Sequence, residues 1–346
     1  MRKTGRRLAV AALLLATAVA TQAQCKFKRI ATIPIEWHDD RLMVDGSING
    51  TPLRMTVDTG AMQTVVSGAL SDRLKLPAAH TNTFHVGFGG RSEVSVARLD
   101  EFSLGRFQWN RMKVSIIWQA LRMPDVLVGA PLLFQRDVEL TDKAIAYYSA
   151  EGCDGAPLGY WADDVPWLPM EPSPERDMRV FVMVKVNGVP VRALVDSGAP
   201  ESLLDAAFAR KLGLHPDDPA LTVGGMGGIG EHVNALSVIT LDSVAIGPEI
   251  VRKARIETVD MWSSVRADVR MSEMGDLMDD RESLILGADF IRAHHLLFAT
   301  SQRRLYFTYL GGEVFRAHEP ERAASAPSAK APAPAPAITR VGQSPS

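Results

Sequence analysis

The chain has 346 residues and a formal net charge of −2, and hydrophobic residues make up 46% of it. A chain of this length can form two domains with separate cores, and its hydrophobic content is that of an ordinary globular protein. Because the charge is close to neutral, no basic surface of the kind that binds nucleic acid is expected.

Residues 1–24 have the layout of a secretory signal peptide. Basic residues at positions 2, 3, 6 and 7 precede an apolar run from Leu8 to Ala20, and small residues follow it. Cleavage is expected after Ala20 or Ala23. An uncleaved anchor is the alternative, but this run is shorter than the roughly 20 residues that span a bilayer. The sequence therefore predicts an exported protein, periplasmic or secreted, without a stable membrane anchor.

The first lobe is predicted to occupy residues 25–149 and to consist mainly of β-strands. Residues 41–48 and 52–57 are rich in strand-forming side chains and flank Asn49-Gly50, a dipeptide typical of tight hairpins. The second of these strands runs directly into Asp58. This aspartate therefore leaves the end of a buried strand and enters a glycine-containing turn.

Two segments are predicted to lie outside the lobes. Residues 150–178 form a connector without a regular element, because glycine and proline recur throughout them. Trp161 and Trp167 indicate that this connector packs against the rest of the protein. Residues 311–346 are rich in alanine, proline and serine, a composition that cannot build a core and predicts a disordered tail.

The second lobe, residues 179–310, repeats the pattern of the first. Residues 179–186 and 190–195 flank Asn187-Gly188, and Asp196 follows 138 positions after Asp58. A duplicated unit is the simplest explanation. The second copy has gained 20 residues near its end, but their acidic side chains lack the spacing of a calcium loop, so no metal site is predicted. Apolar residues with helical spacing predict one short helix in each lobe, at Leu70 and Leu74 and at Phe208 and Leu212.

Two cysteines, Cys25 and Cys153, occur in the chain. In an oxidising compartment they can form a disulfide between the start of the mature chain and the connector. Two independent free thiols are the alternative. A catalytic or metal-binding role is less favoured, because no matching histidine arrangement accompanies them.

Three motifs recur in both lobes. They are the pairs Val57-Asp58-Thr59-Gly60-Ala61 and Val195-Asp196-Ser197-Gly198-Ala199, His85 to Gly90 and Val223 to Gly228, and Val126 to Ala130 and Leu284 to Ala288. Together these motifs resemble those of the retropepsin-like and pepsin-like aspartic proteases, over roughly residues 36–148 and 179–308. The resemblance implies an all-β fold of two similar barrel lobes, with an active site at their interface.

The resemblance also implies that Asp58 and Asp196 form a catalytic dyad. Two carboxyl groups about 3 Å apart share one proton, so one can take a proton from water while the other donates one to the scissile carbonyl. Neither a cofactor nor a metal is needed. The residues implied as supports of the dyad are Thr59 and Ser197, whose hydroxyls hold the loops together, Gly60 and Gly198, which allow close backbone approach, and Ala61 and Ala199.

Alanine after each glycine predicts the pH range of such a dyad. Many acid-active family members have a hydroxyl there, which donates to an aspartate and favours its ionised form. Without that donor, Asp58 and Asp196 should titrate higher, and activity should extend to weakly acidic or neutral pH. The resemblance further places two mobile substrate-binding flaps at glycine-rich segments that contain Phe88, Gly89, Gly90, Met226, Gly227 and Gly228; plain surface turns are the alternative.

The sequence thus predicts an aspartic endopeptidase that cleaves an extended peptide or protein substrate. Its catalytic unit is expected to be monomeric, because two fused lobes supply both aspartates. A peptide-binding or sensing module that retains the protease fold is the first alternative, and an exported structural protein is the second. The presence of both Asp58 and Asp196 favours the enzyme, because a pure binder has no need of two costly adjacent carboxylates.

Overall fold

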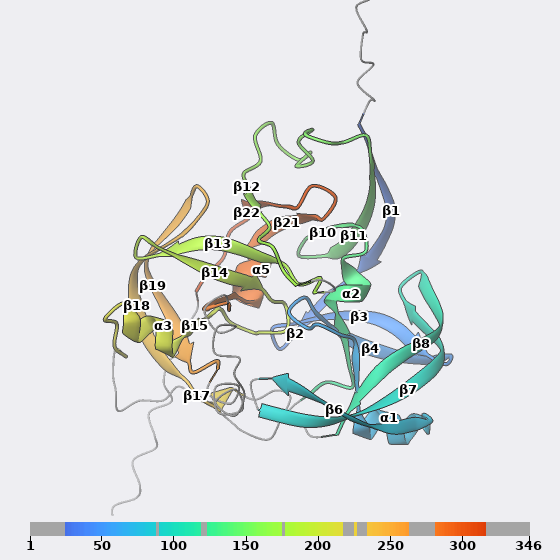
Figure 1. Ribbon diagram of the computed structural model, residues 1–346. Coiled ribbons are helices and arrows are strands. Elements are labelled where there is room, and N and C mark those ends of the chain that lie inside the picture. The colour runs from blue at the N-terminus through green and yellow to red at the C-terminus, as the bar shows by residue number, and fades with distance from the viewer. Residues whose placement is uncertain are drawn as a thin grey trace, which may run out of the picture.

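The computed structural model describes residues 25–87, 90–118, 123–174, 177–216, 225–226, 234–262 and 281–315. Figure 1 shows two β-rich lobes side by side, with a third sheet above both of them. This arrangement confirms the predicted all-β fold with two barrel lobes.

Six strands of the first lobe form a barrel that closes where Gly46 of β3 pairs with Leu104 of β7. The flanking strands β2 and β6 extend this sheet at its edges. In their order across the sheet the strands are β2 (Glu36–His38), β3 (Arg41–Ile48), β4 (Thr51–Asp58), β9 (Val126–Gly129), β5 (Val65–Ser67), β8 (Phe107–Ile117), β7 (Gly90–Leu104) and β6 (Ala78–Gly87).

The second lobe repeats this barrel, which closes through pairing of Lys185 with Ala245. Its strands follow the same order as their counterparts in the first lobe. They are β13 (Phe181–Val186), β14 (Val189–Val195), β20 (Leu284–Leu286), β15 (Leu203–Asp205), β19 (Glu249–Val259) and β18 (Ser237–Ile246), and a separate two-stranded ribbon joins β16 (Gly225–Met226) to β17 (Asn234–Ala235).

The two Asn-Gly dipeptides form the predicted hairpin turns. Asn49 and Gly50 have φ angles of 49° and 79°, and Asn187 and Gly188 have 48° and 82°. Positive φ at both central residues is the geometry that matches the twist of paired strands. Each asparagine also fixes its turn to the neighbouring strand, since Oδ1 of Asn49 accepts the amide of Glu101 and Oδ1 of Asn187 accepts that of Ser243.

In the part of the chain that the structure describes, four short helices pack on the barrels. The predicted helices are α1 and α3, and equivalent caps begin them, because Oγ of Ser67 accepts the amide of Leu70 and Oδ2 of Asp205 accepts that of Phe208. Two further helices, α2 and α5, follow strands β9 and β20 of the third repeated motif. Their bounds are α1 (Gly68–Leu74), α2 (Ala130–Leu133), α3 (Ala206–Lys211) and α5 (Ala288–Arg292).

The third sheet contains strands from both lobes and from the connector. Val138 of β10 pairs with Phe298 of β21, which joins the first half of the chain to the second. In order its strands are β1 (Lys26–Pro34), β11 (Ala144–Glu151), β10 (Asp137–Leu140), β21 (His294–Ala299), β22 (Arg304–Tyr309) and β12 (Trp167–Pro169).

This shared sheet corrects the expectation of two separate cores. One continuous hydrophobic cluster includes Val128 of the first barrel, Leu286 of the second and Phe298 of the third sheet. Phe134 and Phe298 meet with ring centroids 4.8 Å apart. The cores merge because each barrel buries one end of its apolar interior against the same sheet.

The connector also differs from the expected irregular segment. Its residues Trp167–Pro169 form β12, which pairs with β22, and Trp161 stacks on His295 with ring centroids 3.9 Å apart. The structure joins Cys25 to Cys153 by a disulfide that links the beginning of β1 to the connector. The connector is therefore anchored at both ends of the third sheet.

Candidate active site

The two aspartates lie at equivalent strand ends of the two barrels. Asp58 is the last residue of β4, which pairs in parallel with β9, and Asp196 directly follows β14, which pairs in parallel with β20. The amide of Asp196 donates to the carbonyl of Leu286 at 2.9 Å. Buried strands thus fix the backbone of both residues before the chain turns away.

Hydroxyl groups lock the two loops together across the lobe interface. Oγ1 of Thr59 donates to the carbonyl of Val195 at 2.8 Å and accepts the amide of Ser197 at 2.9 Å. In the opposite direction, Oγ of Ser197 donates to the carbonyl of Val57 at 2.7 Å and accepts the amide of Thr59 at 3.1 Å. Both hydroxyls are buried, so these four hydrogen bonds are shielded from competing water.

Each glycine touches the carboxyl group of the opposite loop. A Cβ atom on Gly60 would lie 2.3 Å from Cγ of Asp196, and one on Gly198 would lie 2.5 Å from Cγ of Asp58. The same glycines donate their amides to the aspartate of their own loop, at 3.0 Å for Gly60 and 2.8 Å for Gly198. Only a residue without a side chain fits between the two carboxyl groups and the backbone.

The carboxyl groups of Asp58 and Asp196 are close enough to share a hydrogen bond, and burial raises the pKa of both. The negative charge of Asp196 and the hydrogen bond between the two groups raise the pKa of Asp58 further, well above its ordinary value. At Asp196 the amide of Gly198, the hydrogen bond from Asp58 and the charge of Arg179 oppose the effect of burial. Raised pKa values in two adjacent carboxyl groups favour a state in which the pair holds one proton.

Gly129 and Gly287, the glycines of the third repeated motif, pack closely against the backbone that follows these loops. A Cβ atom on Gly129 would lie 2.4 Å from the carbonyl oxygen of Gln63, and one on Gly287 would lie 2.4 Å from that of Glu201. The amide of Gly129 donates to Oγ1 of Thr64, and that of Gly287 donates to Oγ of Ser202. These two hydroxyl residues are also 138 positions apart, a signal that extends the sequence repeat.

A sequence profile of the family described as Aspartyl protease matches the chain twice, at residues 44–132 and 182–290. The chain belongs to the aspartyl protease family. The two matched segments contain the two loops, so the family pattern and the duplicated geometry coincide.

Solved structures of aspartic proteases are similar to this family member. The aspartic proteinase from Irpex lacteus aligns with a TM-score of 0.47 and 10% identity, over 81% of this chain and 97% of that one. The retropepsin-like aspartic protease from Rickettsia conorii aligns with a TM-score of 0.28 and 17% identity, over 37% of this chain and 96% of that one. A search of curated protein sequences gave no match.

The predicted flap residues are only partly covered by the structure of this aspartyl protease. Gly90 begins β7 and pairs with Gly87 of β6, so it lies at the tip of a long hairpin of the first lobe. Met226 lies in β16, where it pairs with Asn234. The other four, Phe88, Gly89, Gly227 and Gly228, lie outside the described residues.

Arg179 is a residue of the site that the motif analysis did not single out. Its charge acts on Asp196, and its guanidinium group binds Asp177. The repeat does carry a signal for it, because Asp39 and Arg41 precede the first aspartate with the same spacing. Arginine before a strand is common on protein surfaces, so only the fold distinguishes Arg179 from an ordinary surface charge.

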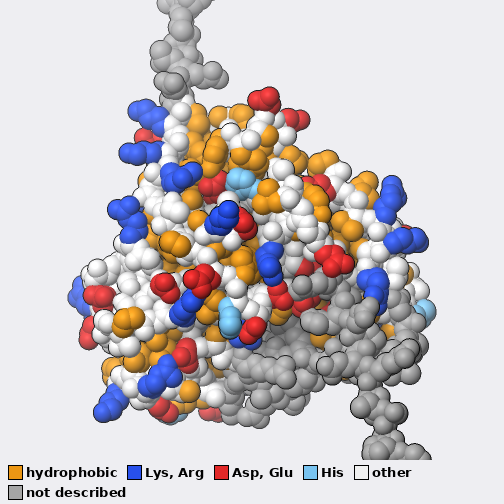
Figure 2. All heavy atoms as spheres, turned by 180° about the vertical axis from the view of Figure 1, so that it is seen from behind, with side chains coloured by type: hydrophobic (Ala, Val, Ile, Leu, Met, Phe, Trp, Pro, Cys, Tyr) orange, Lys and Arg blue, Asp and Glu red, His pale blue; other side chains and the backbone are white. Residues whose placement is uncertain are grey.

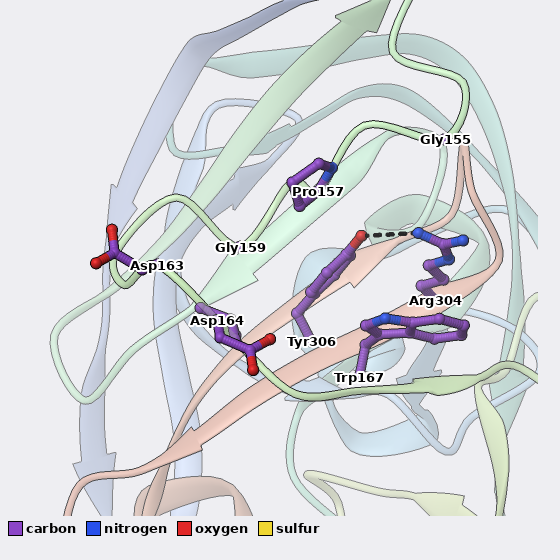
Figure 3. Close-up of a pocket in the computed structure, with 9 residues that line it drawn as sticks. Gly155, Pro157, Gly159, Asp163, Asp164, Trp167, Arg304 and Tyr306 are labelled. Atoms are coloured by element: carbon purple, nitrogen blue, oxygen red, sulfur yellow. Dashed lines mark hydrogen bonds between the residues drawn. The ribbon is translucent and has the colours of Figure 1, made fainter.

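No other described feature competes with this site. A cavity of about 230 Å³ lies under the connector, where Arg304 covers the ring of Trp167 and donates to the hydroxyl of Tyr306 (Figure 3). Neither aspartate lines it. Within the described ranges no group of three or more histidine, cysteine or acidic residues could hold a metal ion, and no helix there is long and apolar enough to span a membrane.

The charge distribution of the described surface is mixed. On the face shown in Figure 2, basic and acidic side chains are interspersed over both lobes. Interspersed charges do not form the continuous positive stripe on which nucleic-acid binding depends.

Proposed function

We propose that the chain is an aspartic endopeptidase that hydrolyses peptide bonds of an extended polypeptide. The observation that carries the proposal is the hydrogen-bonded pair of Asp58 and Asp196, held in loops that Thr59 and Ser197 lock together. Two adjacent carboxyl groups, one buried and the other half-buried, are costly to a fold. Acid-base catalysis accounts for that cost, whereas peptide binding alone does not.

The proposed reaction uses the single proton of the pair. The ionised carboxylate takes a proton from a water molecule as the water oxygen attacks the scissile carbonyl carbon, and the protonated carboxyl group donates its proton to the carbonyl oxygen. In the second step a proton passes to the amide nitrogen, and the C–N bond breaks. No covalent intermediate with the enzyme forms.

Exposed apolar side chains support a preference for hydrophobic residues beside the cleaved bond. Met62 follows the first catalytic loop directly and is 53% exposed, although it is a large apolar residue. Phe84 on the β6–β7 hairpin is 43% exposed, and the guanidinium group of Arg91 lies 3.4 Å above its ring. An extended peptide between the hairpin and the loops would bury such groups.

We also propose activity at weakly acidic to neutral pH. The raised pKa of Asp58 means that the pair keeps its working proton well above the ordinary aspartate range. Ala61 and Ala199 supply no side-chain donor that would lower it, and the backbone amides of Gly60 and Ala61, which do lower the pKa of Asp58, do not outweigh burial and the charge of Asp196. Activity confined below about pH 4, the ordinary range of a carboxyl group, would contradict this.

Incubation of the purified protein with a mixed peptide library from pH 3 to pH 8 tests the proposal. We expect cleavage by the normal protein, inhibition by a statine-type transition-state mimic, and a loss of roughly a thousandfold in kcat/KM for Asp58→Asn. Asp100→Asn is the matched control, because Asp100 is exposed on β7 and the substitution removes the same charge elsewhere in the first lobe. It should cleave normally.

Thermal melting of the same variants separates loss of chemistry from loss of fold. Because folding raises the pKa of Asp58, its ionisation costs stability as pH rises, and Asp58→Asn should melt no lower than the normal protein at pH 7. If the normal protein cleaves no peptide at any pH, the proposal that it is an enzyme is refuted. Calorimetric binding of uncleaved peptides would then favour the peptide-binding module.

The proposal includes an exported, monomeric catalytic unit. Both aspartates come from one chain, so catalysis needs no second copy. Export is supported by the signal-peptide pattern of residues 1–24 and by the pairing of Cys25 with Cys153, because disulfides persist in oxidising compartments.

A further inference from the structure

Arg179 and Asp196 flank the last hydrogen-bonded residues at the open end of a β-hairpin. In the β13–β14 pair, Phe181 lies opposite Leu194, and the amide of Val195 donates to the carbonyl of Val180 at 3.0 Å. Continued outward by one residue, this register would bring Arg179 opposite Asp196. Directly opposed residues of an antiparallel pair project to the same side of the sheet, close enough for their charges to interact.

Buried acids hold the guanidinium group of Arg179 in place. Its Nε lies 3.0 Å from Oδ1 of Asp177, its Nη2 lies 2.8 Å from Oδ2 of the same residue, and its Nη1 lies 3.7 Å from Glu282. Only 18% of the Arg179 side chain and 3% of the Asp177 side chain are exposed. A charge fixed in so little water acts on its neighbours with little screening.

The charged groups around Arg179 and Asp196 come from three segments. Asp58 belongs to the first loop, Asp177 to the connector, and Arg281 and Glu282 to the segment before β20. Burial would lower the pKa of Arg179, but Asp177, Glu282 and Asp196 together raise it. Burial and the charge of Arg179 lower the pKa of Arg281, while Glu282 opposes them. Arg179 is therefore a cation that acts on Asp196, and its charge lowers the pKa of that carboxyl group.

The first lobe does not bury the equivalent acid. Asp39 corresponds to Asp177 in the repeat, yet its side chain is 86% exposed and lies beside His38. The two halves of the site therefore differ in charge environment, although their loops are nearly identical.

We propose that Arg179 is a positioning residue that stabilises the negative charge of Asp196, so that the shared proton resides on Asp58. Asp196 is then the base that receives a proton from water, and Asp58 is the acid that protonates the carbonyl. These roles rest on the proposed function, whereas the asymmetry of charge between the two carboxyl groups does not.

The test compares Arg179→Gln with Arg179→Lys and Arg192→Gln. Arg192 is a matched control, because it also packs on the ring of Phe181, at 3.9 Å, but lies four residues before Asp196 along β14. Two measurements are made on the full-length protein: the pH profile of kcat/KM, and the titration of both site carboxyl groups by NMR with ¹³C-labelled aspartate.

Removing the charge of Arg179 should raise the pKa at which Asp196 ionises. We expect the acidic limb of the kcat/KM profile of Arg179→Gln to move about one unit to higher pH. Arg179→Lys should restore most of the shift, and Arg192→Gln should leave the limb in place. Identical limbs and identical carboxyl titrations for the normal protein and Arg179→Gln would overturn the proposal.

A double variant covers the case in which Arg179→Gln fails to fold because Asp177 is left buried and unpaired. Asp177→Asn combined with Arg179→Gln removes both members of the pair, and a smaller shift in the same direction is expected, because loss of the negative charge of Asp177 opposes it. The NMR titration requires no turnover. A normal protein that cleaves no peptide would therefore refute the proposed function, while the titrations would still decide the role of Arg179.

Discussion

Gly60 and Gly198 are the residues through which each catalytic loop touches the carboxyl group of the other. The space for a Cβ atom at either position is already filled by an aspartate side chain. Their φ angles lie outside the left-handed region, so glycine is required here by close approach and not by backbone conformation. Each motif glycine thus leaves the space in which the carboxyl group of the opposite loop lies.

We expect Gly60→Ala to lower kcat/KM by about a hundredfold, because its methyl group must push Asp196 away from Asp58. Steady-state kinetics with a cleaved library peptide measures the loss. Gly50→Ala is the control, since Gly50 has a φ angle of 79° and open space around it. It should cost about 1 kcal/mol of stability through backbone strain and leave kcat/KM unchanged. Normal kinetics for Gly60→Ala would contradict this account.

At the scale of elements, the site consists of two strand-to-loop turns that each complete the other. The hydroxyl of Thr59 is both donor and acceptor to the second loop, and that of Ser197 is both to the first. Neither loop can satisfy its buried polar groups alone. The lobe interface is therefore held by paired hydrogen bonds at the two loops that carry Asp58 and Asp196, where the proposed reaction requires fixed positions.

Thr59→Val should destabilise the protein by about 1–3 kcal/mol, because it leaves the amide of Ser197 and the carbonyl of Val195 buried without partners. Denaturant unfolding measures this change. Thr59→Ser keeps the hydroxyl and should retain most of the stability and most of the activity. A loss of stability with serine as large as the loss with valine would contradict the dominant role of the hydroxyl.

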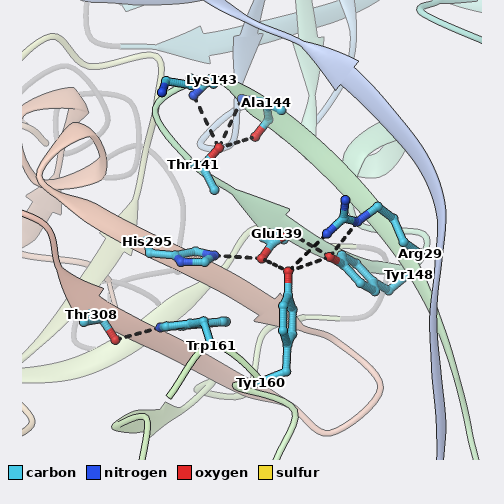
Figure 4. A network of polar contacts seen from close by, with 10 residues as sticks. All are labelled: Arg29, Glu139, Thr141, Lys143, Ala144, Tyr148, Tyr160, Trp161, His295 and Thr308. Carbon is cyan, nitrogen blue, oxygen red and sulfur yellow. Dashed lines mark hydrogen bonds and ion pairs between the residues drawn. The ribbon is translucent and has the colours of Figure 1, made fainter.

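At the scale of the whole molecule, a polar network around the buried Glu139 joins the two halves of the chain. Glu139 of β10 accepts hydrogen bonds from His295 of β21 at 2.7 Å, from Tyr148 of β11 at 2.7 Å and from Tyr160 of the connector at 2.5 Å (Figure 4). Arg29 of β1 donates to the hydroxyl of Tyr148. One carboxylate thus connects strands of both lobes with the connector.

This network should make stability depend on pH. Burial by itself raises the pKa of Glu139, but the hydrogen bonds from His295, Tyr160 and Tyr148 outweigh it, and the pKa lies below its ordinary value. The folded state therefore favours the ionised form. The stability that Glu139 contributes is present above the ordinary glutamate pKa of about 4.3 and is lost as pH falls through the lower pKa of the folded state.

We expect Glu139→Gln to lose about 2 kcal/mol of stability at pH 7, because three hydrogen bonds no longer have a charged acceptor. The loss should shrink below about pH 4. Thermal melts from pH 3 to pH 7 measure both. Glu151→Gln removes an exposed charge from the end of β11 in the same sheet and should change stability by less than about 0.5 kcal/mol. A loss independent of pH would refute the role of the charge.

Local sequence rules determined much of the fold. Asn49-Gly50 and Asn187-Gly188 set their turns through conformations that few other dipeptides adopt, and the caps at Ser67 and Asp205 begin equivalent helices. The 138-residue register then identified two copies of one unit. Each of these features depends on residues close together in the chain, so the sequence carries it directly.

The sequence by itself determined the two lobes, the two Asp-Thr/Ser-Gly loops and the family they resemble. Only the tertiary structure decided that the cores merge through the shared sheet, that Gly60 faces Asp196, and that Glu282 lies 3.7 Å from Arg179. Contacts between residues more than 100 positions apart leave no periodic signal in the chain. They depend on how both barrels pack against one sheet, and that packing alone places the two carboxyl groups side by side.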